Sequence, residues 1–420
     1  MYVGQDGLIP DGLIPLFYTR TPGRLPAFVT ASMPTSKPYY PALTGLRAVA
    51  AYLVFFCHNA PDRIDWRWLP MQSWLSRFME EWGVGVSLFF VLSGFLIATR
   101  YQDRLTLNRL WWGTYLRNRF ARIYPLYALL TLLTFAVAAW QTPWASSSPQ
   151  TSQDMGVNLF LNLTLLRGFF DYYKFSGVMQ GWSLTAEECF YVAAPLLLAG
   201  ARQHTRRLLW YAAGLLGVGF LLVGVGQVVK HVPVLGPGGF MDSIPFMLIY
   251  TFFGRCVEFL AGIGLALFLR RRPATPSDRG TCTWLGVGWI LACTGGMAVL
   301  RATVNASEET KFNLCIPITN FVLPVGVVLL LYGLVREPSW LRSLLETPLL
   351  QLLGRSSYAF YLIHMGIIGN YISTHLIGHP PIKWLELILV SITLYQWVEE
   401  PLRRRLTRTT VLLPIVERVC

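Results

Sequence analysis

The chain has 420 residues, of which 54% are hydrophobic and only 14% are charged. A soluble domain usually carries about 25% charged residues, so this composition excludes a soluble domain with one anchor and indicates a polytopic membrane protein. A net charge of +13 would raise the question of nucleic acid in a soluble protein, but here the basic residues fall between apolar segments. Membrane topology and anionic lipid headgroups explain them, so we expect membrane lipids and no nucleic acid as partners.

Residues 1–36 have the composition of a disordered extension. They contain the repeat DGLIP at Asp6–Pro10 and again at Asp11–Pro15, followed by sequence rich in Pro and Thr. No apolar run in this part is long enough for the core of a signal peptide. We expect residues 37–405 to form one transmembrane domain and residues 406–420 to form a short cytoplasmic tail.

Ten apolar segments follow, most of them close to the length that a spanning helix needs. We therefore predict an all-α protein with about ten transmembrane helices in one bundle. A further apolar stretch at 157–170 is short, and we expect it to be a surface or re-entrant element. The predicted spans are 41–60, 83–101, 121–140, 184–200, 208–229, 247–269, 283–300, 316–334, 354–372 and 382–398.

The loop charges give the orientation. With the N-terminus inside, the inner connections carry about twice as many Lys and Arg residues as the outer ones, which is the expected bias. Both termini are then cytoplasmic, and the protein is a multi-pass protein of the cytoplasmic membrane. Asn305, Ala306 and Ser307 match a glycosylation sequon on an outer loop, which is weak support. The seven cysteines form no CxxC pair and most lie in apolar runs, so we expect no metal site and no disulfide framework.

The first predicted span carries two ionisable residues, Arg47 and His58. Such residues are costly inside a membrane and suggest function. Eleven residues at about 100° each make about three turns, so both lie on one helix face, roughly 16 Å apart along the axis. His58 suits a general base, and Arg47 suits the phosphates or the thioester carbonyl of an acyl donor. The alternatives are a His that anchors the helix end, and an Arg that pairs with Glu399 or Glu258.

This helix opens with LTGLRAVAAYLV, and its Arg is followed by ten residues and then His, a pattern that resembles the acyltransferase-3 family. These are membrane enzymes that acylate sugars of surface polysaccharides, lipopolysaccharide, peptidoglycan and secreted glycosides. The resemblance covers about residues 37–405. Sequence similar to the family begins directly after Met33, so we expect Met33 to be the natural start.

Further motifs carry the same resemblance. In LFFVLSGFLI, Ser93 and Gly94 allow a helix or an acyl chain to approach closely. Many relatives carry Asp where this chain has Ser87, which leaves the group that orients His58 open. In NRFARIYPLY, Arg119 and Arg122 are expected to bind the phosphates of coenzyme A, with ordinary positive-inside Arg residues as the alternative.

In GWSLTAEECFY, the family pattern includes Trp182, Ser183 and Glu187. Glu187 is expected to orient His58 or to hold the acceptor sugar, and Trp182 offers an aromatic face to a sugar ring. Arg255 and Glu258 are three residues apart and are expected to form a structural ion pair.

The motif GRSSYAFYLIHMGI contains four polar side chains that we expect to line the substrate cavity, with a buried core histidine as the alternative for the last one. The family's closing motif is matched near the C-terminus. The four cavity residues are Ser357, Tyr358, Tyr361 and His364, and the closing motif contains Tyr395, Glu399 and Pro401.

The resemblance implies transfer of an acyl group, expected to be acetyl, from cytoplasmic acyl-CoA to a hydroxyl of an extracytoplasmic or lipid-linked glycan. Acyl-CoA would be a co-substrate and no cofactor would be bound. His58 would act as base or as covalent acyl carrier, and one continuous hollow would join it to Arg47. The alternative is a glycan or lipid transporter or flippase, against which the lack of two evident repeated halves counts modestly.

Overall fold

The computed structural model describes residues 39–59, 72–141, 149–231, 238–272, 280–375 and 380–407. Most of these residues are helical, and none of them forms a β-strand. Among them, eight helices are long and apolar enough to span a membrane, which confirms an all-α polytopic membrane protein. The predicted extension at 1–36 lies outside the described residues, as does most of the predicted tail. The eight helices are Pro41–Asn59, Leu75–Tyr101, Arg109–Gln141, Gly181–Ala201, Arg207–Val229, Ile244–Arg271, Thr281–Thr303 and Glu308–Arg336.

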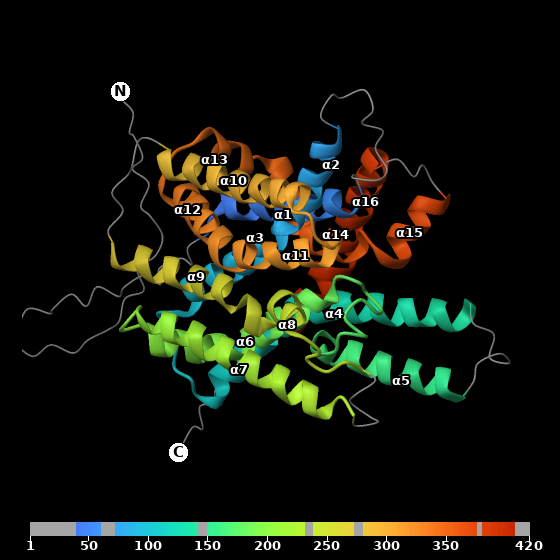
Figure 1. The fold of residues 1–420 in the computed structure, drawn as a ribbon. Helices are drawn as coiled ribbons and strands as arrows, with labels where there is room; N and C mark the ends of the chain where they lie inside the picture. The colour runs from blue at the N-terminus through green and yellow to red at the C-terminus, as the bar shows by residue number, and fades with distance from the viewer. Residues whose placement is uncertain are drawn as a thin grey trace, which may run out of the picture. The chain divides into compact units, whose positions relative to one another are not determined.

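The elements follow one another along the chain without long irregular stretches between most of them (Figure 1). They are α1 (Pro41–Asn59), α2 (Gln72–Glu80), η1 (Glu81–Val84), α3 (Gly85–Tyr101), α4 (Arg109–Gln141), α5 (Pro149–Leu163), η3 (Leu166–Phe169), α6 (Gly181–Ala201), α7 (Arg207–Val229), α8 (Ile244–Tyr250), α9 (Phe252–Arg271), α10 (Thr281–Thr303), α11 (Glu308–Pro317), η4 (Ile318–Val322), α12 (Leu323–Arg336), α13 (Trp340–Leu345), α14 (Pro348–Ile363), α15 (Gly366–His375), α16 (Pro380–Leu394), η5 (Tyr395–Glu399) and α17 (Glu400–Thr407).

The last two predicted spans are not simple helices, so the count of ten is not confirmed. The segment predicted at 354–372 is broken between α14 and α15, where Gly366 has a φ of +78°. That conformation favours glycine and ends the helix. The segment predicted at 382–398 passes from α16 into a π-helical turn. The apolar stretch at 157–170 falls in α5 and η3, and α5, with 15 residues, is not among the eight spans.

The close crossing of α3 and α9 lies at the centre of the core. A Cβ atom on Gly94 would collide with the carbonyl oxygen of Phe259, and one on Gly262 would collide with that of Val91. The rings of Phe90 and Phe259 stack beside this crossing, with centroids 4.5 Å apart. Glycine at both positions therefore lets the two backbones touch, as small residues do at membrane helix interfaces.

The helix α1 is held between α3 on one side and α13 and α14 on the other (Figure 1). Here too the backbones are close, because a Cβ on Gly45 would meet Leu345, and one on Gly354 would meet Thr44. The inner faces of α1 carry Ala48, Ala50 and Ala51, all fully buried. Small residues thus fix the position of α1, which carries both ionisable groups predicted to be functional.

The helices α10 and α12 pack tightly against each other, and Glu337, which directly follows α12, binds the start of α10. Its carboxylate accepts hydrogen bonds from the backbone N–H groups of Cys282 and Thr283, both at 3.0 Å. Burial acts to raise the pKa of Glu337, but these N–H groups outweigh it and hold the pKa below its usual range. The side chain therefore satisfies donors at the start of α10 that would otherwise lack a partner.

Replacing Gly94 by Ala should destabilise the bundle, because the added methyl group forces the α3 and α9 backbones apart. We expect a loss of about 1–3 kcal/mol, the usual cost of overpacking, measured as a lower midpoint of thermal unfolding of the purified protein. The matched control is Gly288→Ala in α10, where a Cβ meets no atom within 4 Å. Equal midpoints for the two variants would contradict the close crossing.

Candidate functional site

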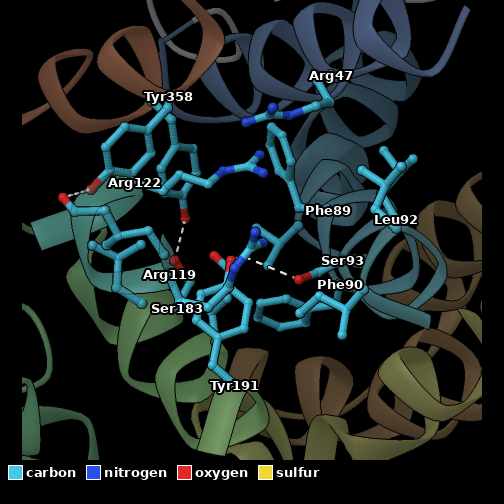
Figure 2. A pocket seen from close by; sticks show the side chains of 17 residues that line it. Arg47, Phe89, Phe90, Leu92, Ser93, Arg119, Arg122, Ser183, Tyr191 and Tyr358 are labelled. Carbon is cyan, nitrogen blue, oxygen red and sulfur yellow. Dashed lines mark hydrogen bonds between the residues drawn. The ribbon is translucent and has the colours of Figure 1, made fainter. Parts of the chain in front are cut away.

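The first cavity lies between α1, α3, α4, α6 and α14 and has a volume of about 70 Å³. Arg47 of α1 contributes to its wall. Figure 2 shows the guanidinium groups of Arg47 and Arg122 pointing into this space, from α1 and α4 respectively. The lining residues are Arg47, Val86, Phe89, Phe90, Leu92, Ser93, Leu96, Ile97, Arg119, Arg122, Ile123, Ser183, Leu184, Glu187, Tyr191, Tyr358 and Tyr361.

Positive charge is concentrated in this first cavity. Arg47, Arg119 and Arg122 all line it, and they face a single lining carboxylate, that of Glu187. Arg119 is buried, and its guanidinium lies 5.6 Å from the ring centroid of Tyr191. Guanidinium groups favour phosphates because they donate hydrogen bonds in a planar fork. The cavity therefore suits a ligand with several phosphate groups.

The carboxylate of Glu187 is held by two hydroxyl donors. Ser93 donates to Glu187 Oε1 at 3.1 Å, and the Tyr191 hydroxyl donates to the same oxygen. Ser183, Glu187 and Tyr191 are spaced four residues apart along α6, so they share one helix face and all line the first cavity. Trp182, one residue before that face, lines a different cavity.

The second cavity contains His58 and has a volume of about 360 Å³. Residues from α1, η1, the turn before α6, α8, α11 and η4 surround it. His58 is exposed on its wall. The lining residues are Val54, Cys57, His58, Glu80, Glu81, Gly83, Val84, Val86, Phe175, Met179, Gln180, Trp182, Ile249, Tyr250, Arg255, Met297, Phe312, Cys315, Ile316, Thr319, Asn320, Tyr361 and Met365.

A backbone carbonyl, and not a carboxylate, orients the ring of His58. Its Nδ1 lies 2.8 Å from the carbonyl oxygen of Val54. A carbonyl only accepts, so Nδ1 donates, and in the neutral ring the lone pair is on Nε2. The structure does not bring Glu187 to His58, because the two line different cavities. The expectation that Glu187 orients His58 is therefore not met by this arrangement.

The expected continuous hollow is divided into two cavities by a thin partition. Val86 and Tyr361 are the residues that line both. Ser183 donates its proton to the carbonyl of Gln180 at 2.8 Å, so the Tyr361 hydroxyl donates to Ser183 Oγ, 2.9 Å away. The rings of Tyr361 and Phe89 also touch, with centroids 5.8 Å apart. Arg47 and His58 thus share α1 but open to opposite sides of this partition.

The four polar residues of the α14 motif have different surroundings. Tyr358 and Tyr361 line the first cavity, and Tyr358 donates to the carbonyl of Ile123 at 2.7 Å. Ser357 is fully buried, donates to the carbonyl of Gly354, and is not among the lining residues of either cavity. His364 also lines neither and is fully buried, with its ring centroid 5.5 Å from that of His58. The expectation that Ser357 and His364 line the cavity is wrong in this structure.

Arg255 and Glu258 lie next to each other in the core, with Arg255 Nε 2.7 Å from Glu258 Oε2. Glu258 has no exposed surface, so it is Arg255, and not Arg47, that neutralises it. Arg255 also donates to Ser87 Oγ at 3.0 Å and to Asn320 Oδ1 at 3.2 Å. Ser87 therefore faces Arg255 in this structure. Sequence reasoning did not single out Asn320, although an amide inside the apolar run ITNFVLP was a signal.

Together, fold and cavities define a polytopic membrane protein with a cationic chamber on one side of a partition and an imidazole on the other. The family model described as acyltransferase domain matches residues 40–397. The chain therefore belongs to the acyltransferase domain family, as its resemblance to acyltransferase-3 proteins indicated.

Three relatives illustrate the similarity. The acyltransferase MdmB of Streptomyces mycarofaciens is 28% identical over 350 residues, which cover 80% of this chain and 81% of MdmB. A Bacillus subtilis protein provisionally named as the peptidoglycan O-acetyltransferase YrhL is 25% identical, over 87% of this chain and 55% of its own length. A Staphylococcus aureus protein provisionally named as an O-acetyltransferase is 24% identical, over 87% of this chain and 58% of its own length. The chain thus spans little more than half of the last two, and no solved structure matches it.

Replacing Arg255 by Met should strongly destabilise the protein, because it leaves the buried carboxylate of Glu258 without its cation. Breaking a buried pair from one side typically costs about 3–5 kcal/mol. The double variant Arg255→Met with Glu258→Leu removes both charges and should regain most of the loss. Thermal unfolding of the purified variants measures both effects, and a double variant as unstable as the single one would argue against a mainly electrostatic cost.

Proposed function

We propose that this protein transfers an acyl group, expected to be acetyl, from cytoplasmic acyl-CoA to a hydroxyl of an extracytoplasmic or lipid-linked glycan. It would do so in the cytoplasmic membrane, with both termini on the cytoplasmic side. The observation that carries this proposal is that one helix, α1, supplies a guanidinium to the cationic cavity and an imidazole to the other cavity. Membership of an acyltransferase family and relatives named for O-acetylation support it.

The donor would bind in the first cavity. Coenzyme A carries a pyrophosphate and a 3′-phosphate, which match the guanidinium groups of Arg47, Arg119 and Arg122. Phosphate groups would supply the negative charge that these three cations lack, since Glu187 is the only carboxylate in the lining. Beside the cations, Phe89, Leu96 and other apolar residues line the same space, and they suit the acyl chain and the pantetheine arm.

His58 would serve as the base. The acceptor hydroxyl gives its proton to Nε2 of His58 while its oxygen bonds to the thioester carbonyl carbon. The carbon–sulfur bond then breaks, and the leaving thiolate takes the proton from the imidazolium to give free coenzyme A. In the second route that the residues allow, Nε2 attacks the thioester, coenzyme A leaves, and the acceptor hydroxyl displaces the imidazole from the acyl group. The hydrogen bond from Nδ1 to Val54 supports both routes, because it keeps the Nε2 lone pair available.

The acyl group would cross at the partition. Arg47 and His58 are roughly 16 Å apart along α1, which an extended pantetheine arm can bridge. The shared wall of Val86 and Tyr361 stands between their cavities, so Tyr361 would shift to admit the thioester. A closed partition would keep water of the second cavity away from the bound thioester when no acceptor is present.

Inverted membrane vesicles test the reaction. Labelled acetyl-CoA should leave label on a glycan, and His58→Ala should lower that labelling by about 10²- to 10⁴-fold, the usual contribution of a general base. His375→Ala, which changes an exposed histidine on α15, is the matched control and should retain full activity. Labelling that persists in the His58 variant would remove this residue from the chemistry, and glycan or lipid translocation without labelling would favour a transporter.

Substitution of Tyr361 tests the partition. Tyr361→Ala should open the first cavity to water, so more coenzyme A is released for each acyl group transferred. Tyr361→Phe keeps the ring and loses only the hydrogen bond to Ser183. The amount of coenzyme A that it releases for each transferred acyl group should therefore lie between the values for wild type and the Ala variant. The ratio of released coenzyme A to transferred label measures this, with Tyr371→Ala on the exposed face of α15 as control. An unchanged ratio in Tyr361→Ala would show that Tyr361 does not separate donor from water.

A further inference from the structure

The wall of the second cavity is mostly apolar. Of its 23 lining residues, seven carry polar or charged side chains apart from Tyr and Trp. The others include the methionines Met179, Met297 and Met365, which adapt to irregular apolar shapes. The rings of Trp182 and Phe175 both pack edge-on against Tyr250, with centroids 5.1 Å and 5.5 Å away. A volume of about 360 Å³ with such walls resembles a site for a small apolar molecule more than a polysaccharide groove.

Most of the polar lining groups are already engaged within the protein. Arg255 is bound by Ser87, Glu258 and Asn320, and the amide of Asn320 donates to the carbonyls of Leu248 and Gly254. The hydroxyl of Thr319 donates to the carbonyl of Cys315 at 3.1 Å. These groups have little capacity left for the hydroxyls of a sugar.

The acidic side of the cavity is likewise neutralised. Arg301 lies 2.7 Å from Glu81 and 3.4 Å from Glu80. The groups that remain for an acceptor in the described part of the chain are few: Nε2 of His58, the buried side-chain oxygen of Gln180, the hydroxyl of Tyr250 and the indole N–H of Trp182. So small a set can bind one or two hydroxyls, but it cannot satisfy the many hydroxyls of a saccharide chain.

The rim of the cavity is also apolar. Phe175 and Phe312 line the cavity and are at the same time exposed on the protein surface. Phe312 belongs to α11, which begins one of the eight helices long enough to span a membrane. An apolar molecule dissolved in the bilayer therefore meets aromatic side chains at the entrance as well as inside.

We infer that the acceptor is an uncharged amphiphile whose reactive hydroxyl is attached to a bulky apolar body, and that this body enters the second cavity together with the hydroxyl. This inference rests on the proposed function and restricts its acceptor. A water-soluble polysaccharide would lose hydrogen bonds to water along the apolar wall and gain few in return. An apolar body loses no hydrogen bonds there, and it gains wherever the contact removes apolar surface from water.

A matched pair of acceptors separates these possibilities. Maltose and dodecyl maltoside offer the same sugar hydroxyls, and only the second carries an apolar body. The full-length protein, reconstituted in lipid nanodiscs free of other glycosides, receives labelled acetyl-CoA and either compound at equal concentration. We expect at least tenfold more label on dodecyl maltoside. Equal labelling, or preference for maltose, would overturn the inference while leaving acyl transfer intact.

Two variants connect the preference to the cavity. Phe312 and Phe321 lie on the same long helix and are similarly exposed, at 42% and 40%, but only Phe312 is among the cavity's lining residues. Phe312→Ala should raise the KM for dodecyl maltoside severalfold, with little change in the KM for acetyl-CoA, and Phe321→Ala should change neither. Equal effects of the two substitutions would assign the preference to the lipid surface and overturn the inference.

The release of coenzyme A distinguishes the remaining outcomes. A compound that enters the second cavity without being acylated should slow the release of coenzyme A from acetyl-CoA. If neither compound accepts label and neither slows this release, the acceptor inference is wrong. In native membranes, release that depends on His58 would still support acyl transfer. Absence of such release would contradict the proposed function itself.

Discussion

The high cost of an unpaired charge in an apolar interior is the constraint on which this structure depends. Arg255 meets it inside the protein, through Glu258, Ser87 and Asn320. The surroundings of three other arginines differ, because a cavity with only one lining carboxylate lies between Arg47, Arg119 and Arg122. The buried carboxylate of Glu399 lies near Arg47 and Arg122 and offsets part of their charge. Three cations still exceed the carboxylates around them, and this excess, which favours an anionic ligand, separates the structural arginine from those proposed to bind the donor.

The same bundle keeps two chemical environments apart. Glycines at the contacts of α1 and α3 with their neighbours bring the helices close enough for one phenol ring, that of Tyr361, and one Val to separate the cavities. The helix α14, which carries Tyr361, ends two residues after it at Ile363, and the break at Gly366 interrupts the chain before α15 begins its own helical course. A residue near a helix end can move with less disturbance of the surrounding packing than one in a continuous span, which suits a partition that opens during transfer.

Sequence patterns predicted the helices and their faces, and failed where the answer depended on neighbouring helices. The spacing of Arg47 and His58 gave one common face of α1, because helical periodicity alone determines it. Periodicity does not identify which helix stands opposite. It therefore left Glu187 next to the wrong partner and placed His364 in the cavity when it packs behind His58. The break at Gly366 was missed because a positive φ leaves no mark on the apolar pattern.

The motifs that carry the family resemblance are distributed unequally between the cavities. Arg47, Ser93, Arg119, Arg122, Ser183, Glu187, Tyr358 and Tyr361 all line the first cavity. In the second cavity the polar and aromatic motif residues are His58, Trp182, Arg255 and Tyr361, and six of the 23 lining residues come from α8, α10 and α11, which contribute none of the motifs. A donor common to many acyltransferases requires the same side chains each time, whereas different acceptors require different walls. On this argument, substitutions in α8, α10 and α11 should change which hydroxyl compound is acylated and leave the binding of the proposed acyl-CoA donor unchanged.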